Sequence, residues 1–337
     1  MLTIEEIQDA WERSAPIELA DPYLARVCMP HRQAFYPLGF PVQIETNSKE
    51  VLHCAAANWQ GFDKLFDVEP MVIRVGVRKS DSTECPRAPF PRVQRHLITN
   101  IADGENYAVT DLNRRFSSIW ITEAALAHRS YVGYFFLESA AMALISTSYA
   151  TAVHAACIER DGCGILLCGD SGAGKTTLAY ACARNGWTYI TDDGSYLVNN
   201  RDDRLVVGNC HQARFRPAAT ALFPELQGRG AMQRAQTGKP SIELELQSRP
   251  CITTSFTSRI NHVVFLNRRN VHRQELTRFP TEVARYFMLQ VLFSPPEIRK
   301  QQIAMIDHLL DDGALELRYT NLEWAVGRLA QLAERGS

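Results

Sequence analysis

The chain has 337 residues, 46% of them hydrophobic, and its 36 basic and 37 acidic side chains leave a formal net charge of −1. A chain of this length favours two domains, and the balanced charge argues against partners such as nucleic acid or an anionic membrane surface. Nine cysteines, an odd number without a Cys-x-x-Cys pair, predict reduced thiols in a cytoplasmic chain and argue against a zinc site. Residues 1–14 lack the apolar segment of a signal peptide, and no later run approaches the length of a membrane span.

The first part of the chain, residues 1–147, mixes strand-like and helical patterns and predicts an α+β N-terminal domain. Strand-like runs lie at residues 71–77, 107–109 and 117–121. The proline-containing run 79–92 predicts a loop or an edge strand. Apolar residues at helical spacing across 122–146 predict one long helix that leads into the next domain.

The middle of the chain, residues 148–281, predicts an α/β domain. A short apolar strand at 163–168 precedes a glycine-rich segment and a helix at 176–185, which Gly186 ends. Further predicted strands lie at 187–191, 196–198, 205–207, 242–246 and 262–266. Residues 282–337 predict a helical C-terminal region packed on this domain, with helices at 282–293, 295–310 and 322–334.

The glycine-rich segment 169–176 reads G-D-S-G-A-G-K-T, a complete P-loop (Walker A) motif between the predicted strand and helix. Its backbone N–H groups and the helix N-terminus would hold a β-phosphate, Lys175 would reach the β- and γ-phosphates, and the Thr176 hydroxyl would bind Mg²⁺. The alternative is a chance match in a glycine-rich turn, which the flanking elements disfavour. The predicted nucleotide contacts are Gly169, Asp170, Ser171, Gly172, Ala173, Gly174, Lys175, Thr176 and Thr177.

Phosphoryl transfer also needs a carboxylate for the metal and a base for the attacking hydroxyl. Asp192 and Asp193 follow the predicted strand 187–191, which we expect to lie directly beside the 163–168 strand and to end at the same edge of the sheet. The two carboxylates would then share Mg²⁺ binding and proton removal. Otherwise they belong to an ordinary Asx turn. His154, at the start of another predicted strand, is either part of this site or a core histidine.

The span 154–193 resembles the nucleotide-binding core of HPr kinase/phosphorylase, a bacterial protein-serine kinase with a phosphate loop of the phosphoenolpyruvate carboxykinase type. In that family a histidine stands fifteen residues before the first loop glycine, the loop reads G-D-S-G-x-G-K, and an Asp-Asp pair ends the next strand, as at 154, 169–175 and 192–193 here. The resemblance implies an α/β P-loop fold, ATP and Mg²⁺ as cofactors, and a homo-oligomer. It implies that one aspartate is the base and the other a magnesium ligand, supported by His154, without saying which aspartate does which.

The chain also departs from the family pattern. Ala155 follows the histidine where the family has glycine, and Thr176-Thr177 follow the lysine where it has Ser-Glu, although Lys-Thr-Thr occurs in phosphoenolpyruvate carboxykinases. The L-E-I-R-G segment and the C-terminal helix that grips HPr have no counterpart here. These departures indicate a divergent HPr-kinase-related protein and argue against HPr as its acceptor.

Cations for the migrating phosphoryl group are expected from Arg214 and Arg216, which alternate with an apolar residue and would share one face of a strand, and from Lys239. An ordinary solvated strand face is the alternative for the two arginines. Arg268 and Arg269 are expected in a surface turn.

Three functions fit these residues. The first is an ATP- and Mg²⁺-dependent kinase that phosphorylates a serine or threonine hydroxyl of a protein or peptide. The second is a kinase of the same core that acts on a small hydroxyl compound. The third is a non-catalytic nucleotide-binding switch, which would not need His154, Asp192 or Asp193.

Overall fold

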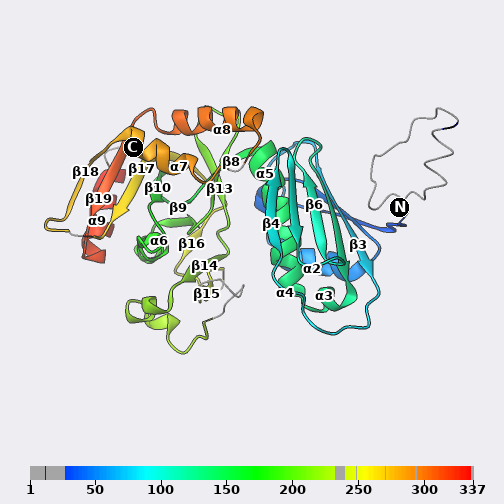
Figure 1. Ribbon diagram of the computed structural model, residues 1–337. Coiled ribbons are helices and arrows are strands. Elements are labelled where there is room, and N and C mark those ends of the chain that lie inside the picture. The colour runs from blue at the N-terminus through cyan, green and yellow to red at the C-terminus, as the bar shows by residue number, and fades with distance from the viewer. Residues whose placement is uncertain are drawn as a thin grey trace. The chain divides into compact units, whose positions relative to one another are not determined.

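The computed structural model describes residues 12, 27–231, 240–247, 249–269, 271–292 and 294–334. Contacts between residues divide the chain into two units, Met1–Ile145 and Ser146–Ser337. Both units contain a sheet with helices packed against it (Figure 1). The chain is therefore a mixed α/β protein.

The first unit contains a seven-stranded mixed sheet in the order β1-β2-β3-β7-β6-β5-β4. Its strands are β1 (His31–Phe35), β2 (Val42–Thr46), β3 (Met71–Arg78), β4 (Phe90–Gln94), β5 (Leu97–Ile101), β6 (Tyr107–Asp111) and β7 (Phe116–Thr122). The neighbours β2, β3 and β7 are parallel, and the other pairs are antiparallel. The helical segments of the unit are η1 (Pro37–Gly39), α2 (Lys49–Trp59), α3 (Glu123–Ala127), α4 (Arg129–Val132), η2 (Gly133–Glu138) and the first part of α5 (Ser139–Ser148), which crosses the boundary at Ile145.

The strands predicted in this unit are confirmed, and β4 forms the sheet edge within the proline-containing run. The single long helix predicted at 122–146 is wrong. Thr122 caps α3 by accepting a hydrogen bond from the Ala125 amide at 3.1 Å, and the chain leaves helical geometry at His128 (φ −95°, ψ 70°). After α4, the segment η2 is wound as a π-helix. Apolar spacing alone does not reveal such changes of winding, because each short segment still has buried residues.

The second unit is built on a ten-stranded sheet with the path β16-β11-β9-β10-β17-β13-β12-β8, to which β19 adds beside β17 and β18 beside β19. Its strands are β8 (Ala150–Val153), β9 (Ala155–Arg160), β10 (Cys163–Cys168), β11 (Thr188–Thr191), β12 (Ser195–Val198), β13 (Leu205–Gly208), β16 (Thr253–Thr254), β17 (Thr257–Asn267), β18 (Glu275–Phe279) and β19 (Ala314–Arg318). A separate antiparallel pair joins β14 (Gln212–Phe215) to β15 (Ile242–Glu245).

Helices cover both faces of this sheet. One core cluster joins the sheet to α6 (Lys175–Arg184) and α9 (Leu322–Ala333), through residues such as Leu178 and Leu329. The other joins it to α7 (Thr281–Leu289) and α8 (Pro296–Leu309), through Met288 and Ile306. Two short 3₁₀ segments, η3 (Pro217–Ala221) and η4 (Pro224–Leu226), follow β14. In the part of the chain that the structure describes, no helix is both long and apolar enough to cross a bilayer.

Two expectations for this unit are corrected. The strand β11 does not lie beside β10, because β9 pairs antiparallel with both and separates them. The segment 282–337 is not wholly helical, because β19 pairs parallel with β17 inside the sheet. The predicted strand at 163–168 is confirmed to the residue as β10, and the predicted loop helix is confirmed as α6.

Candidate functional site

One edge of the second unit's sheet gathers the chemically important residues. Because β9 is antiparallel to both β10 and β11, the start of β9 lies at the same edge as the ends of β10 and β11. His154 immediately precedes β9, the loop begins at Gly169 after β10, and Asp192 follows β11. Although the strand order differs from the predicted one, the loop and the aspartates still lie at the same sheet edge. His154, at the start of β9, lies between the ends of β10 and β11.

The loop between β10 and α6 depends on three glycines with positive φ: 142° at Gly169, 90° at Gly172 and 102° at Gly174. Side chains rarely adopt these conformations. A Cβ on Gly174 would also lie 2.9 Å from the Tyr319 hydroxyl oxygen. The helix α6 starts at Lys175, so its first backbone N–H groups have no carbonyl partner within the helix and are available to an anion.

Lys175 lies under the loop and links it to His154. Its buried ammonium donates to the carbonyl oxygens of Gly169, at 2.7 Å, and Asp170, at 3.3 Å. It also lies 3.0 Å from Nε2 of His154, whose Nδ1 is 3.3 Å from Oδ1 of Asp193. Because an ammonium only donates, Nε2 must accept, and the imidazole proton sits on Nδ1 facing the carboxylate. Burial and the nearby Lys175 charge lower the pKa of His154, in keeping with a neutral ring.

The two aspartates occupy opposite environments. Asp192 is 7% exposed, and its Oδ2 accepts a hydrogen bond from the Arg214 amide at 2.8 Å. Burial raises its pKa to about 6, against the opposing effects of that hydrogen bond and of one to Thr176. The Asp193 side chain is 68% exposed. One carboxylate is therefore held inside beside the Thr176 hydroxyl, and the other faces solvent beside His154.

The donors at this edge fit Mg²⁺. The described residues contain no group of three or more His, Cys, Asp and Glu side chains that would form an all-protein metal cage. Mg²⁺ is commonly held by one or two carboxylates together with substrate phosphates and water. Asp192 and Thr176, which lowers the pKa of the Asp192 carboxyl from nearby, are an oxygen pair of that kind. A cation would also offset the cost of ionising the buried carboxyl.

The predicted cations separate into different roles. Arg216 reaches the loop, with Nη2 3.5 Å from the Ser171 hydroxyl. Arg214 holds Asp192 through its backbone, and its guanidinium Nε lies 3.6 Å from Glu243. One guanidinium thus lies beside Glu243 and the other beside the loop. Lys239 lies outside the described residues.

Sequence reasoning missed two residues that contact this edge. Arg268 follows β17 directly, and an atom at the Cβ position of Gly174 would lie 3.4 Å from its Nη1. Tyr319 follows β19 and lies against the same glycine. Arg268 had a usable signal, because it immediately follows the predicted strand region that became β17. Tyr319 had none, since no strand was predicted at β19, which lies between two predicted helices.

Comparisons with known proteins add little. No protein-family model matches the chain, and no curated protein matches it. Among solved structures, the chain is similar to the Hpr(Ser) kinase/phosphatase from Coxiella burnetii, with a TM-score of 0.31 and 10% sequence identity. That match covers 55% of this chain and 99% of the other.

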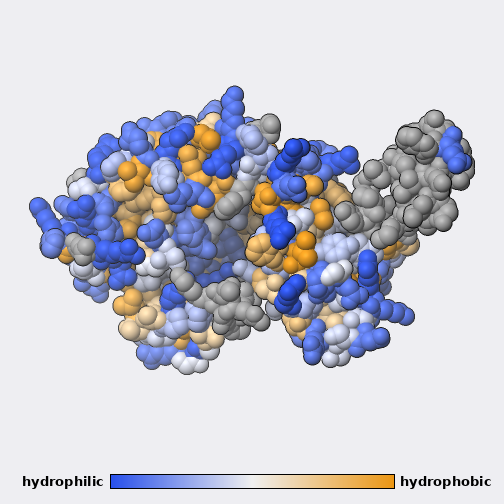
Figure 2. Space-filling model, viewed as in Figure 1, coloured by the Kyte–Doolittle hydropathy of each residue, from blue (hydrophilic) through white to orange (hydrophobic). Residues whose placement is uncertain are grey.

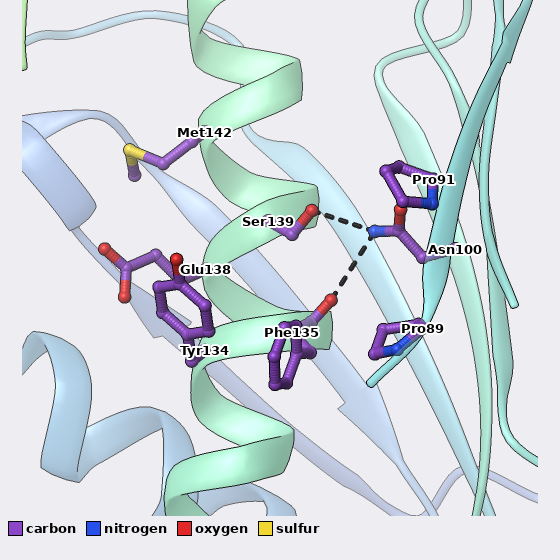
Figure 3. A pocket seen from close by; sticks show the side chains of 8 residues that line it. All are labelled: Pro89, Pro91, Asn100, Tyr134, Phe135, Glu138, Ser139 and Met142. Atoms are coloured by element: carbon purple, nitrogen blue, oxygen red, sulfur yellow. Dashed lines mark hydrogen bonds between the residues drawn. The ribbon is translucent and has the colours of Figure 1, made fainter. Parts of the chain in front are cut away.

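A pocket of about 360 Å³ lies in the first unit (Figure 3). Its lining residues are Pro89, Pro91, Asn100, Tyr134, Phe135, Glu138, Ser139 and Met142. The Asn100 amide donates to the Ser139 hydroxyl at 2.8 Å across it. The exposed side chains of Phe90, Val93 and Ile101 on β4 and β5 add apolar surface to this sheet edge (Figure 2). No acid–base pair lines the pocket, so we assign it no chemistry.

Proposed function

We propose that the protein is an ATP- and Mg²⁺-dependent phosphotransferase that moves the γ-phosphoryl group of ATP to a serine or threonine hydroxyl of a protein or peptide. The observation that carries the proposal is the connected series from Lys175 through His154 to Asp193. It joins the lysine of a phosphate-binding loop to a solvent-facing carboxylate within two contacts. A nucleotide site with a base next to it is what phosphoryl transfer to a hydroxyl requires.

In this proposal the loop and the buried aspartate bind the nucleotide. The N–H groups at the start of α6 and the Lys175 ammonium neutralise the β- and γ-phosphates. Asp192 and the Thr176 hydroxyl hold Mg²⁺, which would neutralise the charge that develops on the phosphate oxygens. Arg216 supplies a further cation beside Ser171.

Asp193 is the proposed base. As the acceptor oxygen forms its bond to the γ-phosphorus, the bond to the β,γ-bridging oxygen breaks and ADP leaves, while the hydroxyl proton passes to the Asp193 carboxylate. His154, with its Nδ1 3.3 Å from the Asp193 Oδ1, keeps that carboxylate close to Lys175. The unequal burial of the two aspartates supports this division, because a base that meets a large acceptor must be reachable from solvent.

The presence of a proposed base favours a kinase over a non-catalytic nucleotide-binding switch. A nucleotide-dependent switch needs the loop, the lysine and the metal ligands, but gains nothing from a solvent-facing carboxylate beside a neutral histidine. A protein or peptide acceptor is favoured because the 68% exposure of the Asp193 side chain leaves room for a hydroxyl carried on a larger molecule.

The test is a transfer assay with radiolabelled Mg·ATP and a serine- and threonine-containing peptide pool, beside a panel of small hydroxyl compounds. We expect label on peptides with the native protein and none with Asp193→Asn, which still binds Mg·ADP. Label on small compounds alone would overturn the peptide acceptor. Absence of nucleotide binding would overturn the whole proposal.

A further inference from the structure

The sheet edge that carries the loop has a second half, on the side of β10 away from β9 and β11. There β17 runs parallel to β10, and β19 runs parallel to β17, so both strands end at the loop edge. Arg268 directly follows β17 and Tyr319 directly follows β19, and both lie against the Gly174 position. His154, Asp192 and Asp193 lie on the opposite side of β10, as the strand order requires.

Tyr319 presents a buried hydroxyl to the loop with no partner of its own. The residue is 2% exposed, and its hydroxyl makes no hydrogen bond to any described residue. Leaving a buried polar group unpaired is unfavourable, so such groups normally have a partner in the functional state. Burial raises the pKa of Tyr319 to about 12, so the hydroxyl stays protonated and able to donate. The oxygen would lie 2.9 Å from a Cβ on Gly174, which places it against the loop.

Arg268 is positioned by the Tyr319 ring. Its guanidinium carbon lies 5.6 Å from the ring centroid, an attractive cation–π arrangement. It forms no ion pair with any carboxylate among the described residues, unlike Arg214 with Glu243. The side chain is exposed while its end reaches the loop at Gly174. A guanidinium held in place without an acidic partner is suited to an incoming phosphate.

We propose that Arg268 and Tyr319 bind the α-phosphate of the nucleotide, the guanidinium by an ion pair and the phenol by a donated hydrogen bond. The inference rests on the proposed function. The strand order indicates how the nucleotide lies across the sheet edge. The γ-phosphoryl group belongs on the side of β10 that carries His154 and Asp193, because transfer takes place there. The α-phosphate and the nucleoside therefore extend toward β17 and β19. Both residues are therefore positioning residues for the nucleotide and take no part in the transfer itself.

The test is a set of dissociation constants for Mg·ADP, Mg·ATP and magnesium tripolyphosphate, measured by calorimetry on the full chain. Arg268→Ala should weaken all three about tenfold or more, as expected for the loss of a hydrogen bond to a charged group. Arg269→Ala removes the same charge from the next, also exposed, position and should change binding by less than about twofold.

Tyr319→Phe removes only the hydroxyl. Because that hydroxyl has no partner among the described residues, the unliganded variant should melt no lower than the native protein, while Mg·ADP should raise its melting temperature less. Equal effects of the Arg268 and Arg269 changes would overturn the inference, as would a loss of kcat at unchanged affinity. If Arg268→Ala weakened ADP binding but left tripolyphosphate binding unchanged, Arg268 would contact the nucleoside, and its proposed ion pair with the α-phosphate would be wrong. A native protein that binds no nucleotide would instead overturn the proposed function.

Discussion

The Lys175 ammonium lies 3.0 Å from Nε2 of His154, although 21 residues separate them in the chain. A β-hairpin accounts for this contact. Asp161 and Gly162 both have positive φ, 52° and 82°, as in the two-residue turns that suit hairpins, and they pair Arg160 with Cys163. At the other end of the same two strands, Ala155 pairs with Cys168, so His154 stands at the beginning of the loop. The spacing from His154 to Gly169 is therefore a consequence of hairpin geometry.

Replacing Asp193 with Asn should separate binding from chemistry. The amide is nearly isosteric and cannot accept the acceptor's proton, so transfer should fall by roughly two to four decades, the usual contribution of a positioned base. Mg·ADP affinity should be unchanged, because the proposed magnesium ligands are Asp192 and Thr176. Rapid-quench transfer assays and calorimetry measure the two effects. Transfer at the native rate would show that another group removes the proton.

The contribution of His154 should depend on its contacts with Lys175 and Asp193 more than on its charge. In His154→Gln, the side-chain oxygen can accept from Lys175 and the amide can donate to Asp193, whereas His154→Ala can do neither. We expect the alanine variant to lose at least about tenfold more kcat than the glutamine variant, with both folded by circular dichroism. Equal losses in the two variants would indicate that the imidazole itself exchanges a proton during the reaction.

Lys175→Met should give a folded protein that does not respond to nucleotide. Burial lowers the pKa of Lys175, so the native fold bears the cost of enclosing the ammonium, and an apolar chain of similar length avoids it. The melting temperature without ligand should therefore hold or rise. Its increase on adding Mg·ADP should disappear, because the cation that faces the phosphates is gone. A full ADP-dependent increase would exclude the predicted role of this lysine.

Local patterns predicted much of this fold, and the failures have particular causes. The strand β10 and the helix α6 have strong signals, an apolar run and a glycine-bounded helix, and both are confirmed. The strand β19 has the sequence Ala-Leu-Glu-Leu-Arg, whose residues favour helices. It is a strand because β17 and β18 offer hydrogen-bonding edges on either side, a long-range effect that no local pattern contains.

The arrangement of the site was harder to predict than the identity of its residues. The Asp161-Gly162 dipeptide between apolar runs was a readable hairpin signal, and it would have placed β9 directly beside β10. No signal distinguishes Asp192 from Asp193, because β11 has buried residues on both of its faces and alternation does not tell which carboxylate turns inward. Arg268 and Tyr319 meet the loop only through the parallel pairing of β17 and β19.

The raised pKa of Asp192 makes the stability of the unliganded protein depend on pH. Its carboxyl has a pKa of about 6 in the folded protein and 3.8 as its ordinary value. Between these values the folded state binds more protons than the unfolded state, so the free energy of unfolding falls as pH rises through this window. By pH 7.5 the buried carboxyl is ionised, and the cost of ionising it lowers the free energy of unfolding by about 3 kcal/mol. Asp192→Asn removes it, and its amide can still accept from the Arg214 N–H and donate to Thr176.

We therefore expect the Asp192→Asn variant to be more stable without ligand than the native protein at pH 7.5, with the difference vanishing below about pH 4. Urea unfolding at several pH values measures this difference, and comparison of the two proteins cancels the titration of other groups. Addition of Mg·ADP should reverse the order, because a magnesium ligand is missing from the variant, whereas ADP with a chelator should not. A stability difference independent of pH would show that Asp192 ionises normally and would remove its burial as the reason for assigning it to the metal.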